Sequence, residues 1–254
     1  MSEHLPDFLI AGAPRSGTTW LYYLLDRHPQ IYMATPVKPE PKFFLVDELY
    51  QKGIDFYRQK WFAEVPDEML AGEKTTNYLE SSRAAQRIHQ HLSRVKLIFI
   101  LREPADRAYS NYLWSYMNGL ETGDFETALD LEEQRERDLP EHLHYARPHA
   151  YFSRGLYAQL LHPYFKRFPR KQILCLRYED LMTHPQELAQ SLHEFLGISV
   201  RPEDALRQGV SNPSKNKGEP LSEDTLKDLR ERYIKPNREL AQLLGPQFEM
   251  WRCS

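Results

Sequence analysis

The feature that most constrains the fold of this chain is an apolar run. It passes directly into a glycine-bounded turn and then into a segment with helical spacing. The residues FLIA at 8–11 are apolar and β-prone, and GAPRSGTTWL follows them at 12–21. Two further apolar runs, at 95–101 and 172–178, also precede segments with helical spacing. This alternation predicts an α/β fold in which helices flank a central parallel sheet.

The helix-spaced segments are spread over the whole chain. Their ranges are 18–27, 81–91, 105–117, 125–137, 157–168, 187–196, 222–233 and 237–243. Proline-containing stretches such as MATPVKPEPK and SNPSKNKGEP interrupt them and are expected to be surface loops. At 254 residues the chain is long enough for one large α/β domain, so we predict a single domain over 1–254.

The charge and cysteine content limit the classes of function. A formal net charge of -3 argues against a general nucleic-acid binder or a membrane-surface protein, which would usually carry a basic excess. The two cysteines are too few for a disulfide framework and fit a reducing compartment. The N-terminus lacks the basic end and long apolar run of a secretory signal, and no segment approaches membrane-spanning length, so we predict a cytoplasmic protein.

The turn after the first apolar run is typical of an anion site. Its backbone N–H groups and the dipole of the following helix favour a bound anion. Both glycines have the spacing of a nucleotide triphosphate loop, but Thr18 stands where that motif requires lysine, and Arg15 is the nearby cation. The run at 95–101 ends in Arg102, where such an enzyme would usually have a magnesium-binding aspartate. A plain strand-to-helix turn with a solvated Arg15 is the alternative.

A second candidate anion cluster is LREPADRAYSNY at 101–112. Arg102 would lie at the carboxyl edge of the sheet, with Ser110 about two helical turns further along the chain. Both side chains could approach one phosphate. Equally, Arg102 could pair with a surface carboxylate while Ser110 serves as a small packing residue.

Together these segments resemble the sulfotransferases that use 3′-phosphoadenosine 5′-phosphosulfate (PAPS), especially the branch of heparan sulfate 3-O- and N-sulfotransferases. The resemblance runs from residue 8 nearly to the C-terminus, through PRSGTT, GIDFY, GEKTTNY, LREPADRAYSNY, FPRKQILCLRYEDL, SKNKG and RYIKPN in the expected order. It implies the phosphate-loop-like sulfotransferase fold and PAPS as the sulfuryl donor, with no metal.

The resemblance assigns the donor-binding residues. The loop for the 5′-phosphosulfate corresponds to Arg15, Ser16, Gly17, Thr18 and Thr19. The 3′-phosphate would be held by Arg102 and Ser110 and covered by a loop containing Lys217 and Gly218. Without the resemblance, the lysines of SKNKG would be solvated.

The resemblance also assigns catalytic residues. Glu40, in VKPEPKFF at 37–44, matches the family's catalytic base, which takes the proton of the acceptor as it attacks sulfur. Lys42 stands where the heparan enzymes often carry histidine or glutamine and is a candidate acceptor contact; Phe43 and Phe44 are expected in the core. Lys74, beside Glu73 in GEKTTNY, would stabilise charge on the transferring group. A solvated Glu40 and an ordinary surface ion pair of Glu73 with Lys74 are the alternatives.

These assignments predict in-line sulfuryl transfer to a hydroxyl or amine of a carbohydrate or small metabolite. Arg15 would stabilise the leaving phosphate electrostatically, because arginine stays protonated. A nucleotide-dependent kinase of similar fold and a non-catalytic nucleotide-binding relative remain alternatives. The acceptor, the choice between oxygen and nitrogen, and the oligomeric state are left open.

Overall fold

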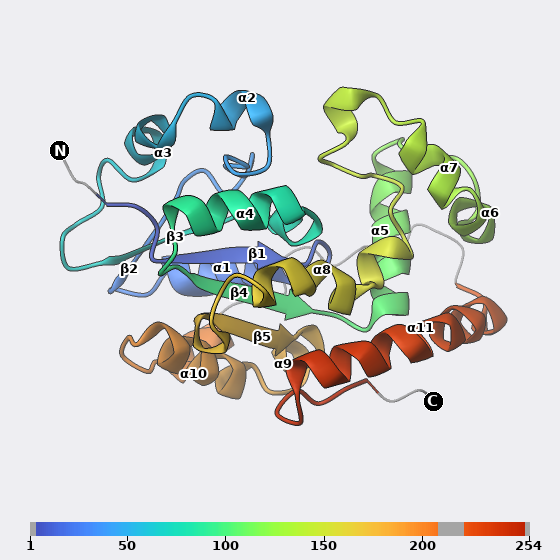
Figure 1. The fold of residues 1–254 in the computed structure, drawn as a ribbon. Coiled ribbons are helices and arrows are strands. Elements are labelled where there is room, and N and C mark those ends of the chain that lie inside the picture. Colours follow the sequence, from blue (N-terminus) through green and yellow to red (C-terminus); the bar gives the residue numbers. More distant parts are fainter. Residues whose placement is uncertain (1–3, 208–220, 252–254) are drawn as a thin grey trace. The chain divides into compact units, whose positions relative to one another are not determined.

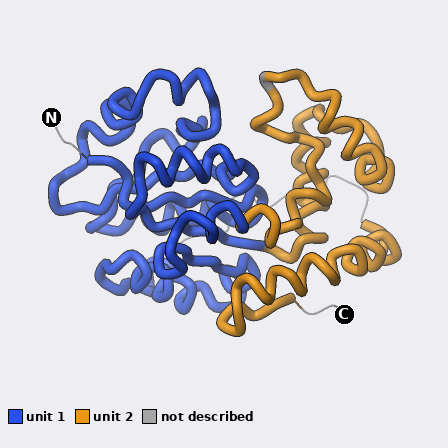
Figure 2. The backbone as a smooth tube through the Cα atoms, in the orientation of Figure 1, with its two compact units in different colours: residues 1–101, 162–211 blue, residues 102–161, 212–254 orange. Residues whose placement is uncertain are grey.

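The computed structural model describes residues 4–207 and 221–251. The chain forms two compact units, shown in Figure 2: unit 1 comprises residues 1–101 and 162–211, and unit 2 comprises residues 102–161 and 212–254. One of the three boundaries between the units, at residues 161 and 162, falls within helix α8 (Tyr157–Phe165).

Unit 1 is built on a five-stranded parallel sheet in the order β2-β3-β1-β4-β5 (Figure 1). The strands are β1 (Phe8–Gly12), β2 (Ile31–Met33), β3 (Leu70–Lys74), β4 (Lys96–Leu101) and β5 (Ile173–Arg177). Every residue of β1 is buried, as expected for a central strand that is covered on both faces. The register pairs Leu9 with Glu73 of β3 and with Leu97 of β4.

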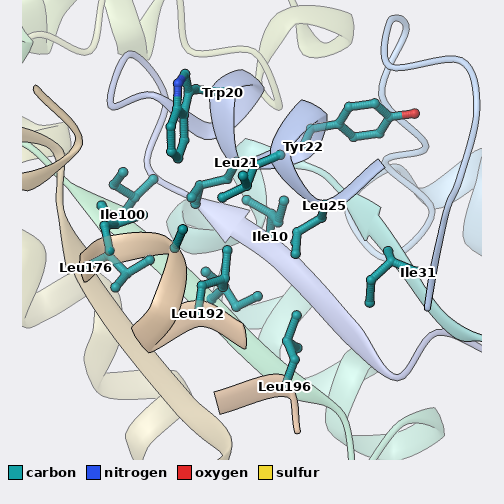
Figure 3. Close-up of a cluster of buried hydrophobic side chains, with 14 of the residues drawn as sticks. Ile10, Trp20, Leu21, Tyr22, Leu25, Ile31, Ile100, Leu176, Leu192 and Leu196 are labelled. Carbon is teal, nitrogen blue, oxygen red and sulfur yellow. The ribbon is translucent and has the colours of Figure 1, made fainter. Parts of the chain in front are cut away.

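The helices of unit 1 cover both faces of this sheet. They are α1 (Thr18–Asp26), α2 (Asp47–Tyr50), α3 (Ile54–Trp61), α4 (Ser82–His91), α9 (Tyr178–Thr183) and α10 (Pro185–Leu196), with the 3-10 turns η1 (Thr76–Glu80), η4 (Arg170–Gln172) and η5 (Pro202–Arg207). Figure 3 shows the core between α1, α10 and one face of the sheet, where Leu21, Ile10 and Leu192 are buried together. On the other face, Phe99 meets Tyr164 of α8 at 5.1 Å between ring centroids.

The strand order places β1 where the direction of the sheet's connectivity reverses. Its neighbours are β3 on one side and β4 on the other. In open α/β sheets, ligands bind beyond the carboxyl ends of the strands at such a switch point. We therefore expect a functional site at the segments that follow β1 and β3.

Unit 2 is helical in its described part. Its elements are α5 (Pro104–Met117), α6 (Phe125–Asp130), α7 (Glu132–Arg137), η2 (Glu141–Leu143), η3 (Ser153–Gly155) and α11 (Glu223–Leu244). Its core joins α5 and α6 to α11 through Tyr112, Phe125 and Tyr233. Gly155 lacks a side chain where a Cβ atom would lie 2.4 Å from the Tyr233 hydroxyl, so these two segments can approach closely.

The α/β prediction with a central parallel sheet is confirmed, as are the three predicted strands within one or two residues. Two details were wrong. The single helix expected at 125–137 is broken at Leu131, where Glu132 is buried and accepts hydrogen bonds from the amides of Phe152 and Ser153. The two helices expected at 222–233 and 237–243 are one helix, because Leu229, Tyr233, Leu240 and Leu244 form one buried stripe across Pro236.

Candidate active site

The loop that follows β1 has the backbone shape of an anion cradle. The amide of Ala13 donates to the carbonyl of Ile100 at 2.9 Å, which ties the start of the loop to β4. Arg15 and Gly17 then adopt left-handed conformations, with φ of 66° and 90°. Glycine adopts this conformation without steric cost, whereas Arg15 is a non-glycine residue held in it.

The end of this loop begins α1 without a side-chain cap. Gly17 is the N-cap residue, so no side chain accepts from the first amides of the helix. Ser16 is fully buried, and its hydroxyl has no hydrogen-bond partner among the described residues. Buried polar groups normally have partners, so an orphan hydroxyl beside an uncapped helix start fits a site for an anion.

Gly17 offers a direct test of how tightly the loop is built. A Cβ atom on Gly17 would lie 3.0 Å from side-chain atoms of Leu181 and Tyr178, whereas on Gly197, also left-handed with φ 79°, its nearest neighbour would be Lys96 Nζ at 3.9 Å. We expect Gly197→Ala to lower the free energy of unfolding by about 1–2 kcal/mol, and Gly17→Ala to lower it by about 1–3 kcal/mol more. Urea denaturation measures both, and equal losses would contradict the crowding argument.

Glu40 is held by Lys74, the last residue of β3, and by Thr76, which follows the strand. Lys74 Nζ donates to Glu40 Oε1, and the two side chains form an ion pair in which Lys74 is 2% exposed and Glu40 13% exposed. The amide of Thr76 donates to Glu40 Oε2 at 3.1 Å, and its hydroxyl lies 3.2 Å from the same oxygen. The carboxylate is therefore fixed from two sides, and the alternative of a solvated Glu40 is wrong.

This cluster lies beside the loop after β1. The amide of Thr75 donates to the carbonyl of Ile10 at 3.1 Å, which joins the end of β3 to β1. A Cβ atom on Gly12 would lie 3.2 Å from the carbonyl oxygen of Thr76, so the glycine allows the two segments to touch. A carboxylate, a buried ammonium and an anion cradle thus share one edge of the sheet.

Glu73 does not pair with Lys74, which corrects the alternative of an ordinary surface ion pair. Adjacent residues of a strand point to opposite faces. Glu73 is fully buried, and burial raises the pKa of its carboxyl to about 7, while the phenols of Tyr78 and Tyr57 act in the opposite direction. Neither carboxyl oxygen has a hydrogen bond of ordinary geometry among the described residues.

The residues after Glu40 anchor its segment. Phe43 and Phe44 are fully buried, as predicted, and Phe43 stacks on Tyr57 with ring centroids 4.5 Å apart. Lys42 is half-buried with φ 54°, and its amide donates to the hydroxyl of Thr75 at 3.1 Å. Contact of Lys42 with an acceptor stays a prediction.

Four predicted donor-binding residues lie outside unit 1 or outside the described residues. Arg102 follows β4 and belongs to unit 2, where its carbonyl accepts from the Tyr157 hydroxyl at 2.9 Å. Ser110 is a buried residue of α5 in the same unit. Lys217 and Gly218 lie outside the described residues, and their role stays a prediction.

Within residues 4–207 and 221–251, there is no group of three or more histidine, cysteine, aspartate or glutamate residues able to hold a metal ion. No helix in the described part of the chain is long and apolar enough to cross a membrane.

The sequence predictions missed the residues that fix Glu40. Thr75, Thr76 and Tyr78 lie in GEKTTNY and Tyr57 lies in GIDFY, but neither pattern assigns these four residues a role. The available signal was the pair of hydroxyl residues directly after Lys74, since hydroxyls can hold a carboxylate or a loop amide.

The chain is similar in sequence and in fold to known sulfotransferases. A family model for the sulfotransferase domain matches residues 5–229. A sulfotransferase of known structure from Alicyclobacillus acidocaldarius is 28% identical with a TM-score of 0.76, covering 95% of this chain and 96% of that one. The mouse sulfotransferase SULT7A1 complexed with PAP is 16% identical with a TM-score of 0.58 and shares the fold.

Among curated proteins, the mouse heparan sulfate glucosamine 3-O-sulfotransferase 3A1 is 27% identical over 97% of this chain and 65% of its own length. The human bifunctional heparan sulfate N-deacetylase/N-sulfotransferase 2 is 29% identical over 78% of this chain and 22% of its own length. The chain therefore spans between about a fifth and just under two thirds of the length of these curated relatives.

Proposed function

The chain belongs to the sulfotransferase family, and on this premise we propose that it transfers a sulfuryl group from PAPS to a hydroxyl or amine of an acceptor. The observation that carries the proposal is the Glu40–Lys74 ion pair beside the glycine loop after β1. It supplies a base and a cation at the edge of the sheet where ligands of such folds bind.

The loop of residues 12–19 suits the 5′-phosphosulfate of the donor. The left-handed backbone at Gly17, the uncapped start of α1 and the orphan Ser16 hydroxyl supply hydrogen-bond donors for an anion. Thr18 and Thr19 add hydroxyls, and Arg15 adds a positive charge. We assign Arg102, Ser110, Lys217 and Gly218 to the 3′-phosphate, as the resemblance implies.

Glu40 is the proposed base. Its carboxylate takes the acceptor proton, the acceptor oxygen or nitrogen bonds to sulfur, and the bond from sulfur to the 5′-phosphate oxygen breaks. The leaving oxygen carries the electron pair, and Arg15 and the loop amides stabilise it. As Glu40 becomes neutral, it loses its charge pairing with Lys74, whose ammonium then interacts with the developing charge on the sulfuryl group.

The acceptor class follows from the relatives and from Lys42. Two similar proteins are named for sulfation of heparan sulfate, so a carbohydrate is the first candidate and a small metabolite the second. We place Lys42 at the acceptor side. The assignments of a single sulfotransferase domain over 1–254, a cytoplasmic location and the absence of nucleic-acid partners likewise stay proposals.

The donor assignment is tested with labelled PAPS and a mixture of sugars, amines and phenols, with products read by mass spectrometry. We expect label transfer that persists with a chelator present, and binding of 3′-phosphoadenosine 5′-phosphate that is at least about tenfold tighter than that of adenosine 5′-phosphate, because the 3′-phosphate adds charge-assisted hydrogen bonds. Transfer from ATP with magnesium, and none from PAPS, would support the kinase. Tight nucleotide binding with no transfer from either donor would support the non-catalytic relative.

A further inference from the structure

Two buried histidines that the sulfotransferase assignment does not use lie side by side in unit 1. His28 follows α1, and His193 belongs to α10. Their ring centroids are 5.0 Å apart, and their side chains are buried in the folded chain. Leu25 and Leu196, which lie near the two histidines in sequence, belong to the core cluster that joins α1 to α10 (Figure 3). The pair therefore lies where the ends of these two helices meet.

Three side chains hold the chain between α10 and η5. His28 Nε2 lies 3.0 Å from the carbonyl oxygen of Ser199. Gln30 Oε1 accepts from the amide of Ser199 at 2.8 Å. His193 Nδ1 accepts from the amide of Arg201 at 3.2 Å. We call these three contacts the histidine clamp, and they fix this part of the chain to α10 and to the turn that leads into β2.

The hydrogen bonds of the two rings determine where each ring carries its hydrogen. A backbone amide can only donate, so a ring nitrogen that accepts from an amide carries no hydrogen. The amide of Gln30 donates to His28 Nδ1 at 3.2 Å, and the amide of Arg201 donates to His193 Nδ1. Each ring is therefore neutral, with its hydrogen on Nε2. In His28 this hydrogen bonds to the carbonyl of Ser199, and in His193 it has no partner among the described residues.

We propose that the histidine clamp is a pH-sensitive device, which holds the chain between α10 and η5 only while both rings are neutral. A protonated imidazole carries hydrogen on both nitrogens, so its Nδ1 would face an amide hydrogen that it could no longer accept. Protonation of His193 would release the amide of Arg201. Protonation of His28 would release the amide of Gln30, whose side chain holds Ser199. The proposal does not depend on the sulfotransferase assignment.

The surroundings of His193 set the pH range in which the clamp opens. Burial is the largest cause that lowers the pKa of His193 to about 4, and the neighbouring His28 lowers it further. Asp204 and Glu203 of η5 also face the ring and raise the pKa, whereas Arg201 lowers it. Opening of the chain returns the imidazole to its ordinary pKa of about 6.5. The clamp is therefore fully stable above about pH 6.5 and weakens as pH falls toward about 4.

NMR of the imidazole nitrogens tests the geometry in the wild type. At about pH 7.5, both His28 and His193 should be neutral rings with the hydrogen on Nε2. A ring that carries its hydrogen on Nδ1 would overturn the proposal, because that nitrogen could not accept from an amide. The measurement needs neither a substrate nor a variant.

Hydrogen exchange measures the opening. Between about pH 7.5 and about pH 5, the protection factor of the Arg201 amide, corrected for intrinsic exchange, should fall roughly thirtyfold through His193 alone. This factor follows from a pKa of about 4 in the closed clamp and about 6.5 in the open one. Amides of the central strand β4 should keep their protection over the same range. Constant protection of Arg201, or a parallel loss in β4 that marks unfolding of the whole unit, would contradict a local device.

Three variants identify the group that titrates. His193→Gln removes the ring, so the pH dependence of the Arg201 protection factor should disappear. His162→Gln makes the same change at an exposed position of α8 and should keep the wild-type dependence. Gln30→Ala should lower the protection of the Ser199 amide by the same factor at both pH values, because that contact contains no titrating group. Wild-type pH dependence in His193→Gln would overturn the proposal. If this variant does not fold, the two wild-type measurements decide.

Discussion

Replacing Glu40 by glutamine is expected to lower kcat for sulfuryl transfer by about 10²–10⁴-fold, the usual contribution of a general base. Glutamine keeps the shape of the side chain, but it cannot take a proton from the acceptor. It also offers one acceptor oxygen where the carboxylate offers two, so one of the contacts to Lys74 and Thr76 is lost. The measurement is the rate of label transfer from PAPS to the acceptor identified by the screen.

Two controls separate a chemical loss from a folding loss. Calorimetry should show unchanged affinity for 3′-phosphoadenosine 5′-phosphate, because Glu40 lies outside the loop of residues 12–19. Glu48→Gln makes the same chemical change at an exposed position of α2 and should leave kcat unaltered. A Glu40→Gln variant with near wild-type kcat would show that another group removes the proton.

The apolar strands could be predicted from sequence, whereas the strand that carries the site could not. β1, β4 and β5 are runs of large apolar residues. β3 reads LAGEK, which has low strand propensity. It forms a strand because it lies between β1 and β2, and because Gly72 leaves room for the ring of Phe8, which a Cβ atom would approach to 2.1 Å.

The candidate site also has one part that the sequence predicts and another that it does not. The anion loop follows from local spacing, since glycines between a strand and a helix predict its backbone shape. Glu40, in contrast, is brought to Lys74 and Thr76 across 34 and 36 residues, and no local pattern encodes that contact. The family resemblance identifies Glu40 and Lys74 as candidate catalytic residues. Their ion pair and the separate burial of Glu73 can be seen only in the folded chain.

Replacing Lys74 by methionine is expected to lower kcat by about 10²–10³-fold, the range for removal of one preorganised donor at a developing charge. Methionine fills similar volume without the ammonium, so the change isolates the charge of a side chain that is 2% exposed. It also leaves the carboxylate of Glu40 with hydrogen bonds only from Thr76 among the described residues, which should lower the free energy of unfolding. Label transfer and urea denaturation measure the two effects.

A double-mutant cycle distinguishes the two roles of Lys74. If Lys74 acts only by holding Glu40, then Lys74→Met should have no further effect on kcat once Glu40 is glutamine, because the pair would behave as one unit. If its ammonium also stabilises the transferring sulfuryl group, the double variant should be slower than Glu40→Gln by about a further tenfold. We expect the second result, because loss of the negative charge on Glu40 during proton transfer leaves a buried ammonium in need of an anionic partner. Equal rates for Glu40→Gln and the double variant would restrict Lys74 to positioning the base.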